Sequence, residues 1–463
     1  MGPQAPDPTP SPPPPGGRPV TTADLRLAPR PSIDPRRWPD LAASRRRARR
    51  RVEAKVAEQI FRAAVRRLAV RVELGDTVLG GAATDPDAPV MQIARPDAFF
   101  AAVGASGLIG FGESYMAGDW DSPDLASLLE VFAAQVATLV PAPLQRLRAF
   151  YVAKNPRAER NSTRNTRNNI ARHYDLSNDL FASFLDETMS YSAALFEGET
   201  SPGASVADEQ TTVCRPVTRP GWADLVPAQQ RKVDRILDAA GVGEGTRVLE
   251  IGTGWGELAI RAAGRGATVR SVTLSSEQLE LARQRVADAG LSDRVQIDLL
   301  DYRAVEGQYD AVVSVEMIEA VGHQYWGEYF RTIDRVLAPG GAVAIQAITM
   351  PHDRMLATRN TYTWINKYIF PGGFLPSTEA LEERSRTHSG LRLTERLSFG
   401  QHYAQTLRLW DERFVGSLER VRELGFDEVF DRMWHFYLEY SQAGFRSGYL
   451  DVQQLVFRRE VQA

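Results

Sequence analysis

The sequence predicts an α/β protein with a doubly wound, mostly parallel, Rossmann-like sheet, preceded by a smaller N-terminal α+β domain. Three observations predict this fold. Apolar strands alternate with amphipathic helices from about residue 167 onward, and one of these strands ends in a glycine-rich loop. Before that region, residues 70–155 alternate short strands with helices in a pattern too short for a second doubly wound sheet.

Length and composition set limits on the class of protein. The 463 residues are enough for roughly two to three domains, and the net charge is −3. The single cysteine, Cys214, excludes an internal disulfide and a cysteine zinc site, and no metal is expected. No apolar run reaches the roughly 18–20 residues of a membrane span, and the proline-rich N-terminus has no apolar signal core. We therefore expect a cytoplasmic protein.

The chain divides into four parts. Residues 1–22 are rich in proline and glycine and are expected to be disordered. Residues 23–155 form the N-terminal α+β domain, and the polar, basic residues 156–166 form a linker. Residues 167–463 form the catalytic domain, in which the turn-rich segment 199–224 is expected to be a surface insertion.

The N-terminal domain begins with a strongly basic helix. Six arginines lie within Arg45–Arg51, and apolar residues recur after them at helical spacing up to Leu68. This pattern predicts an amphipathic cationic helix. Nucleic acid and an anionic lipid surface are both candidate partners, and a solvated helix that packs on its own domain is the simpler alternative.

The remaining elements follow from apolar periodicity. In the N-terminal domain we expect strands at Ala69–Leu74 and Val90–Ile93, helices at Asp97–Val103 and Leu125–Leu139, and a turn-rich aromatic segment at Gly110–Trp120. In the catalytic domain we expect strands at Arg247–Ile251, Thr268–Thr273, Val295–Leu299, Tyr309–Val315 and Gly341–Ile348. The helices expected between them include Pro227–Ala240, Ser276–Ala289 and Tyr325–Leu337.

The glycine-rich loop is the strongest functional signal. Glu250 closes the first catalytic strand, and Gly252, Gly254 and Gly256 follow at alternate positions. Glycines let the backbone approach a ligand closely, and the helix start offers free N–H groups. The pattern E-x-G-x-G-x-G is typical of class I S-adenosylmethionine methyltransferases. A dinucleotide site is the second interpretation, but Glu257 lies where the dinucleotide motif needs its third glycine. A glycine-rich turn that binds no ligand is the structural alternative.

Residues after the next strands, all but one of them polar, are expected to complete the cofactor site. They are Thr273, Leu274, Ser275, Gln278, Asp301, Tyr302 and Glu316. Asp301 can accept from an adenine amine, although it can also be a simple helix cap. Glu316 and Glu319 follow the fourth strand at the carboxyl edge of the sheet, where one acid can face a sulfonium and the other the acceptor. Ordinary solvated charge is the alternative.

Two further segments are expected to bind an acceptor. The segment around His173 and Tyr174 is rich in polar and aromatic residues and predicts a helical lid, although such a histidine is more often structural. The aromatic stretch Trp364–Pro376 has the apolar lining that a long acyl chain needs. Its candidate contacts are Tyr368, Phe370, Pro371 and Gly372. A loop packed over the sheet is the alternative.

Several motifs in order resemble one family. They are Gly110–Trp120, Ala171–Leu180, Tyr191-Ser192, Glu250–Gly256, Val272–Ser275, Asp301–Arg303, Glu316–Gly322, Tyr368–Ser377, His402–Trp410 and Ala443–Arg446. The chain resembles the cyclopropane-fatty-acyl-phospholipid synthase and mycolic acid methyltransferase family. Within it, Ser314–Gly322, Gln346–His352 and Met355–Arg359 are most similar to actinobacterial enzymes of 10-methyl (tuberculostearic) fatty acid synthesis.

The resemblance implies a reaction and partners. S-adenosylmethionine would methylate the cis double bond of an oleoyl phospholipid, with Tyr191 and Ser192 as further cofactor contacts. Loss of a proton would give a 10-methylene chain, which a separate flavin- and NADPH-dependent reductase would saturate. The expected partner is then the bilayer surface at the inner face of the plasma membrane, and no nucleic acid. A cyclopropane synthase and a non-catalytic S-adenosylmethionine- or lipid-binding protein are the alternatives.

The chain departs from the family at its base. Cyclopropane synthases hold a bicarbonate ion with a Cys, a Glu, a His and a Tyr. Glu319 and Tyr403 match that set, whereas Ala193 replaces the Cys and Gln346 replaces the His. Ala320 also replaces a His that usually follows the Glu. These changes argue against bicarbonate and favour the methylene product. The catalytic residues expected are Glu319, as base or cation stabiliser, with Tyr403 and Gln346.

Overall fold

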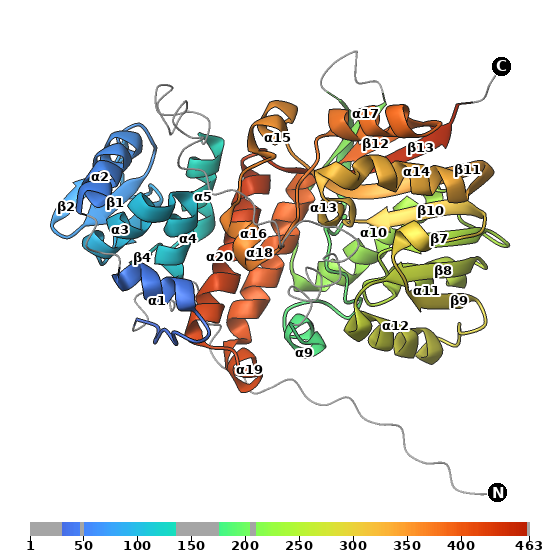
Figure 1. Ribbon diagram of the computed structural model, residues 1–463, viewed down its shortest axis with the longest axis horizontal. Coiled ribbons are helices and arrows are strands. Elements are labelled where there is room, and N and C mark those ends of the chain that lie inside the picture. The colour runs from blue at the N-terminus through green and yellow to red at the C-terminus, as the bar shows by residue number, and fades with distance from the viewer. Residues whose placement is uncertain (1–29, 47–50, 136–175, 204–209, 461–463) are drawn as a thin grey trace, which may run out of the picture.

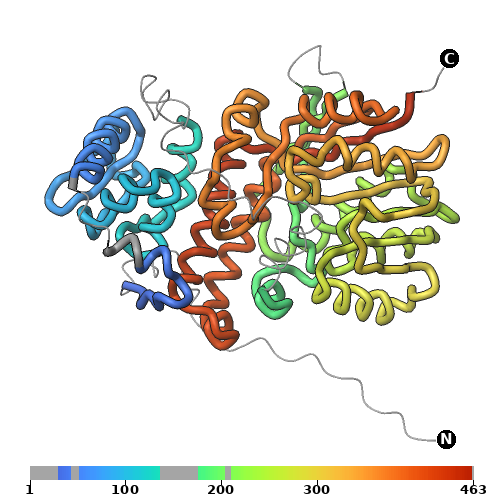
Figure 2. Tube along the Cα trace, viewed as in Figure 1, coloured from blue at the N-terminus to red at the C-terminus, as the bar shows by residue number. Residues whose placement is uncertain are grey.

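The chain forms two sheets joined by long helices in a computed structural model that describes residues 30–46, 51–135, 176–203 and 210–460 (Figure 1). The predicted tail 1–22 and linker 156–166 lie outside these residues. Figure 2 shows the C-terminal part of the chain rising through the middle of the molecule before it ends in the larger sheet.

The larger sheet has nine strands in the described residues, in the order β5-β6-β12-β13-β11-β10-β7-β8-β9. Its parallel part consists of β7 (Arg247–Ile251), β8 (Thr268–Thr273), β9 (Val295–Leu299), β10 (Tyr309–Val315) and β11 (Leu337–Thr349). The five strands predicted for this region are confirmed, and only the start of β11 differs, because the chain pairs with Tyr309 already at Leu337.

Helices cover both faces of this sheet, which confirms the doubly wound fold. They are α10 (Leu225–Ala239), α11 (Glu257–Gly264), α12 (Ser276–Asp288), α14 (Trp326–Val336) and α17 (Thr378–His388). Side chains alternate between the faces along each strand. Val248 lies in the core beneath α10, α11 and α12, whereas its neighbour Leu249 lies in the core beneath α14 and α17.

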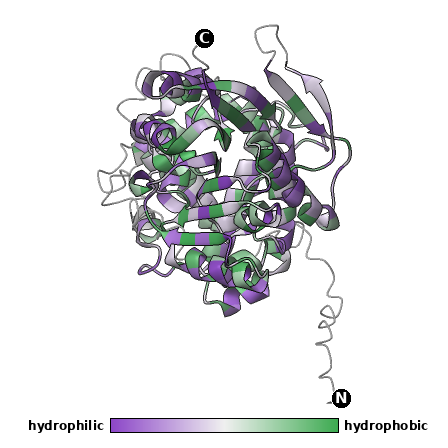
Figure 3. Cartoon of the chain, turned by 90° about the vertical axis from the view of Figure 1, so that its right-hand side faces the viewer, coloured by the Kyte–Doolittle hydropathy of each residue, from purple (hydrophilic) through white to green (hydrophobic). Residues whose placement is uncertain are grey.

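The other edge of the sheet was not predicted. β13 (Asp451–Arg459) runs antiparallel between β11 and β12 (Leu391–Ser398). The segment 199–224, expected as a surface insertion, extends the edge of the sheet through β6 (Thr211–Pro216), which pairs with β12, and β5 (Gly198–Pro202). β5 is exposed at every position. Its ribbon, which a grey trace joins to β6, is mostly pale or purple in Figure 3, so this strand carries few hydrophobic side chains.

The N-terminal unit is a small α+β fold, with sheet order β2-β1-β3-β4 in the described residues. Its strands are β1 (Arg71–Leu74), β2 (Thr77–Leu79), β3 (Val90–Ile93) and β4 (Trp120–Asp121). Its helices are α1 (Pro39–Arg46), α2 (Arg51–Val65), α3 (Pro96–Ser106), α4 (Leu108–Met116) and α5 (Leu125–Ala134).

The expectation of a turn-rich segment at Gly110–Trp120 is wrong, because most of it forms helix α4. Gly110 and Gly112 serve close packing, whereas Gly118 lies in the turn that follows the helix, with a φ angle of 66°. A Cβ on Gly110 would lie 2.0 Å from the carbonyl oxygen of Ala102, and one on Gly112 would lie 2.5 Å from the ring of Trp364. Glycine therefore lets α4 approach both α3 and the catalytic part of the chain.

Two long helices join the halves of the molecule. α18 (Gly400–Gly416) and α20 (Glu428–Arg446) pack together, and α20 also packs on α4 and α5 (Figure 1). The Arg432 side chain on α20 donates to the carbonyl oxygens of Tyr115 and Trp120 and to the Asp121 carboxylate. Among the described residues, no helix is both long enough and apolar enough to cross a membrane.

Candidate active site

The glycine loop leaves β7 and starts α11. Gly252, Gly254 and Gly256 have φ angles of 98°, 51° and 91°, in the region that favours glycine. A Cβ on Gly252 would lie 2.2 Å from Cγ of Met317, whereas one on Gly254 would meet no atom within 4 Å. The loop therefore rests on Met317 at one end and is open at its middle, which fits a ligand bound against the backbone.

Glu250 lies beneath this loop. The carboxylate accepts a hydrogen bond of 2.5 Å from Ser271, whose Oγ is also 2.7 Å from the hydroxyl of Thr253. Burial raises the pKa of the Glu250 carboxyl to about 8. Among the described residues, the Glu250 carboxylate is linked through Ser271 to Thr253 of the glycine loop. Its contact with a cofactor remains a prediction.

The predicted residues after β8 lie together at the start of α12. Ser275 caps the helix by accepting from the N–H of Gln278, and its own N–H donates to Thr273 Oγ1. Thr273 and Gln278 also share a hydrogen bond of 3.4 Å, and Leu274 is partly buried between Thr273 and Ser275. This compact group of neutral polar side chains lies at the carboxyl end of β8, next to the glycine loop, where a ribose would bind.

Asp301 and Tyr302 follow β9 in a short 3₁₀ turn. Asp301 caps that turn and binds the Arg303 side chain through both carboxylate oxygens. Burial acts to raise its pKa, but the hydrogen bonds from Arg303 outweigh it and lower the pKa. The cap and the ion pair leave Asp301 ionised at the rim of the site.

Tyr191 and Ser192 lie in a loop that α10 holds. The Tyr191 hydroxyl is 2.9 Å from that of Tyr437, and Ser192 Oγ accepts a hydrogen bond of 2.6 Å from Lys232 Nζ. Lys232 is buried, which lowers its pKa to about 8. Sequence reasoning missed Lys232, because a lysine in an amphipathic helix normally marks the solvent face.

Glu316 is the centre of the hydrogen-bond network. Its Oε1 accepts from the backbone N–H of Ala193 at 2.9 Å and from Gln346 Nε2 at 2.8 Å. Its Oε2 accepts from the Tyr403 hydroxyl at 2.8 Å. Burial raises its pKa, while these hydrogen bonds and the charge of Lys232 act in the opposite direction. Tyr403 and Gln346, predicted to act with Glu319, donate to Glu316, and their catalytic roles remain predictions.

Glu319 has a different environment on the short helix α13 (Ile318–Val321). Its Oε1 accepts from the Ile348 N–H at 2.5 Å, and its buried Oε2 has no hydrogen-bond partner among the described residues. Burial, and then the charge of Glu316, raise the pKa of its carboxyl to about 8. The two acids therefore differ in their surroundings, because three donors bind Glu316 and the Ile348 N–H binds Glu319.

The predicted aromatic loop reaches Glu319. It follows α16 (Trp364–Tyr368), and the Phe374 N–H donates to the Glu319 carbonyl oxygen at 2.8 Å. Phe370 packs on Tyr437, and Pro371 and Gly372 form the partly buried turn between. Tyr368 turns away and donates to Glu113 of the N-terminal unit. His173 and Tyr174 lie outside the described residues, so the lid remains a prediction.

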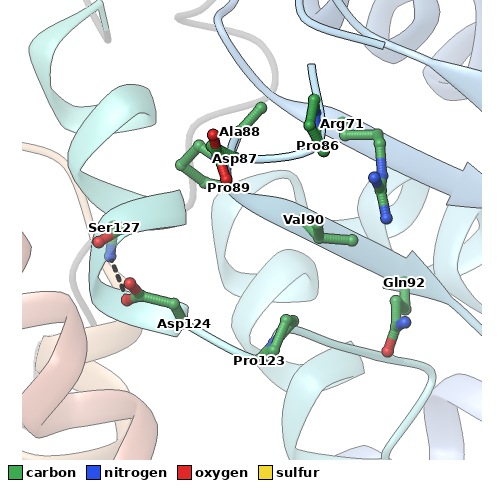
Figure 4. Close-up of a pocket in the computed structure, with 10 residues that line it drawn as sticks. All are labelled: Arg71, Pro86, Asp87, Ala88, Pro89, Val90, Gln92, Pro123, Asp124 and Ser127. Atoms are coloured by element: carbon green, nitrogen blue, oxygen red, sulfur yellow. Dashed lines mark hydrogen bonds between the residues drawn. The ribbon is translucent and has the colours of Figure 1, made fainter. Parts of the chain in front are cut away.

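A cavity of about 460 Å³ lies elsewhere, in the N-terminal unit (Figure 4). Arg71 on β1, Gln92 on β3 and Asp124 at the start of α5 line it. All of its lining residues belong to the N-terminal unit, so it is separate from the candidate active site. The described part of the chain holds no group of three or more His, Cys, Asp or Glu residues that could bind a metal ion.

Comparison with known proteins places this geometry in context. A family model described as mycolic acid cyclopropane synthetase matches residues 161–455. The chain is 54% identical over 439 residues to the tuberculostearic acid methyltransferase UfaA1 of Mycobacterium tuberculosis, covering 95% of this chain and 99% of that protein. It is 33% identical to the cyclopropane-fatty-acyl-phospholipid synthase of Escherichia coli K12, covering 82% and 91% of the two chains.

Solved structures support the fold. The cyclopropane synthase MmaA2 from Mycobacterium tuberculosis is 29% identical with a TM-score of 0.54, over 63% of this chain and 97% of that one. CmaA1, a mycolic acid cyclopropane synthase complexed with SAH and CTAB, gives the same identity and TM-score over 66% and 99%. The resemblance and the Rossmann-like fold expected from the sequence are confirmed.

Proposed function

The chain belongs to the mycolic acid cyclopropane synthetase family, and from this premise we propose that it methylates the double bond of an oleoyl chain in a phospholipid to give a 10-methylene product. As a family member it is an S-adenosylmethionine-dependent methyltransferase. The observation that carries the proposed product is the 54% identity to a tuberculostearic acid methyltransferase along almost the whole of both chains.

The residues of the site fit the methyl donor. The open glycine loop, the polar group at Ser275 and the Tyr191–Ser192 loop surround one end of the parallel sheet, where donors bind in this fold. When bound, S-adenosylmethionine supplies an electrophilic methyl group. Met317 connects the glycine loop with the two acids, because its side chain packs against Gly252 and its backbone lies between Glu316 and Glu319.

The two acids suit the chemistry of the acceptor. Transfer of a methyl group to an alkene leaves a positive charge on the acyl chain, and a proton must then leave. Glu316, bound by three donors, supplies a fixed negative charge. One oxygen of Glu319 has no hydrogen-bond partner among the described residues, and burial raises its pKa to about 8, so Glu319 is suited to take the proton. After a hydride shift, loss of that proton creates the methylene group.

The product has two alternatives. A cyclopropane synthase is favoured by the 33% identity to the Escherichia coli enzyme over 91% of its length, and a non-catalytic binding protein by the changes at Ala193, Ala320 and Gln346. The methylene product keeps a double bond, so its conversion to a methyl branch needs two electrons and two protons. We propose that a separate flavin- and NADPH-dependent reductase supplies them.

Lipid mass spectrometry tests the function. In a host rich in oleate and without the reductase, we expect expression to yield a phospholipid acyl chain with one added carbon and a terminal methylene. Co-expression of a reductase of that class should convert it to the methyl branch. A cyclopropane ring would establish the first alternative, and the absence of any new acyl mass from the folded protein would establish the second.

Glu319→Gln tests the proposed base. Because the amide cannot accept the proton, turnover should fall roughly 10²-fold or more at constant donor binding. In the wild type, turnover should rise with pH and level off above about 8, because the carboxylate forms only as pH passes the raised pKa of Glu319. The variant should lose this dependence.

The matched control is Glu328→Gln, which removes a carboxylate whose side chain is 41% exposed on α14. It should leave turnover and the pH profile unchanged. Full turnover of Glu319→Gln would exclude the role of Glu319 as base.

We also propose that the protein docks on the inner face of the plasma membrane through α2. This helix lies at the end of the molecule farthest from the larger sheet (Figure 1). It exposes Val52 and Val56 together with Lys55, and Arg66 and Arg67 are exposed just beyond it. Exposed apolar residues among cations are suited to an anionic lipid surface.

Sedimentation with vesicles tests the docking. The double variant Arg66→Gln, Arg67→Gln should bind anionic vesicles roughly tenfold or more weakly, since each basic residue contributes about 1 kcal/mol at such a surface. Arg420→Gln, which removes an exposed arginine on α19 (Leu418–Glu423), is the control. Binding that does not change in high salt or on vesicles without anionic lipid would refute electrostatic docking.

A further inference from the structure

Glu316 occupies the centre of the ring that the family resemblance assigns to bicarbonate. The four positions of that ring are Ala193, Glu319, Gln346 and Tyr403 in this chain. The backbone N–H of Ala193, the amide of Gln346 and the hydroxyl of Tyr403 all donate to one carboxylate, which is that of Glu316. A carboxylate and a bicarbonate ion present the same pair of charged oxygens.

We infer that the Glu316 carboxylate replaces bicarbonate as the resident anion of this active site, so that the enzyme works without bicarbonate. The inference rests on the proposed methyl transfer and adds a residue role to it. Glu316 was predicted from the sequence to contact the cofactor, and the structure gives it this second role beside Glu319.

The donors of the ring leave no place for a second anion. The Gln346 amide is engaged at both ends, because its oxygen accepts from Gln454 Nε2 at 3.1 Å while its nitrogen donates to Glu316. Ala193 has no thiol to contribute. A bicarbonate ion here would compete for occupied donors and would face the charge of Glu316, so the residues present do not fit it.

The backbone holds Glu316 in place at a cost. Its φ angle is 51°, a strained conformation that a residue with a Cβ adopts rarely. The three hydrogen bonds to the carboxylate hold the residue in this conformation. The Glu316 N–H also donates to the Gln346 carbonyl oxygen at 2.8 Å. The conformation aims the side chain into the ring.

Lys232 supplies the compensating charge. Its buried ammonium lies 2.6 Å from Ser192 Oγ, in the residue next to Ala193, and its charge acts to keep Glu316 ionised. A negative charge fixed in this way stabilises the positive charge that develops on the acyl chain. Glu319, on the neighbouring turn, is left to exchange the proton.

Chemical rescue tests the inference with purified full-length protein in carbonate-free buffer. Wild-type turnover should not change when bicarbonate is added. Glu316→Gly removes the carboxylate and suits the positive φ, so it should fold but lose roughly 10²-fold in turnover. Added formate or bicarbonate should restore at least a tenth of wild-type turnover, whereas chloride at equal ionic strength should not.

Glu316→Gln is the matched variant. Its amide fills the same space without charge, so it should be as inactive as Glu316→Gly but insensitive to formate, and its thermal midpoint should confirm a folded protein. A wild type that needs bicarbonate, a fully active Glu316→Gly, or a folded Glu316→Gly that neither anion rescues would each overturn the inference. A wild type without turnover would refute the proposed function instead.

Discussion

The candidate active site depends on one carboxylate held inside the protein by groups from three different parts of the chain. Glu316 leaves the end of β10 in a left-handed conformation, and the Tyr191–Ala193 loop, β11 and α18 each donate one hydrogen bond to it. An unpaired charge in the interior is strongly unfavourable, so these donors cannot separate without a large cost. The carboxylate therefore fixes the relative positions of elements that are distant in sequence.

Neighbouring groups extend this constraint to both substrates. On the side of the methyl donor, Lys232 donates to Ser192 and places its charge near Glu316. Met317 packs against Gly252 of the glycine loop. On the acceptor side, the backbone of Glu319 binds Phe374 of the aromatic loop. One short segment at the end of β10 thus touches the loop that would hold the methyl group and the loop that would hold the acyl chain. The two carboxyl groups have different roles, because three hydrogen bonds bind Glu316, whereas one oxygen of Glu319 has no partner in the part of the chain that the structure describes.

The sequence predicted the parallel half of the sheet because apolar strand patterns and glycine loops are local signals. It also predicted that Glu316 and Glu319 lie at the carboxyl edge of the sheet. It did not predict β12 and β13, whose pairing joins segments far apart in sequence, or the helix at Gly110, where glycine serves packing. The role of Lys232 and the contact of Gln346 with Glu316 were hidden, since both depend on which side chains face them across the fold rather than on their own neighbours.

The central claim is that Glu316 is the resident anion of the site and Glu319 the base, and infrared titration tests this directly. Difference spectra of the wild type against Glu316→Gln and Glu319→Gln isolate the carboxyl bands of the two residues. The account predicts the band of an ionised carboxylate for Glu316 at the pH of turnover, and a Glu319 band that titrates near 8. If Glu319 ionises first, or if both bands titrate together near the ordinary range of a glutamate, the account is contradicted.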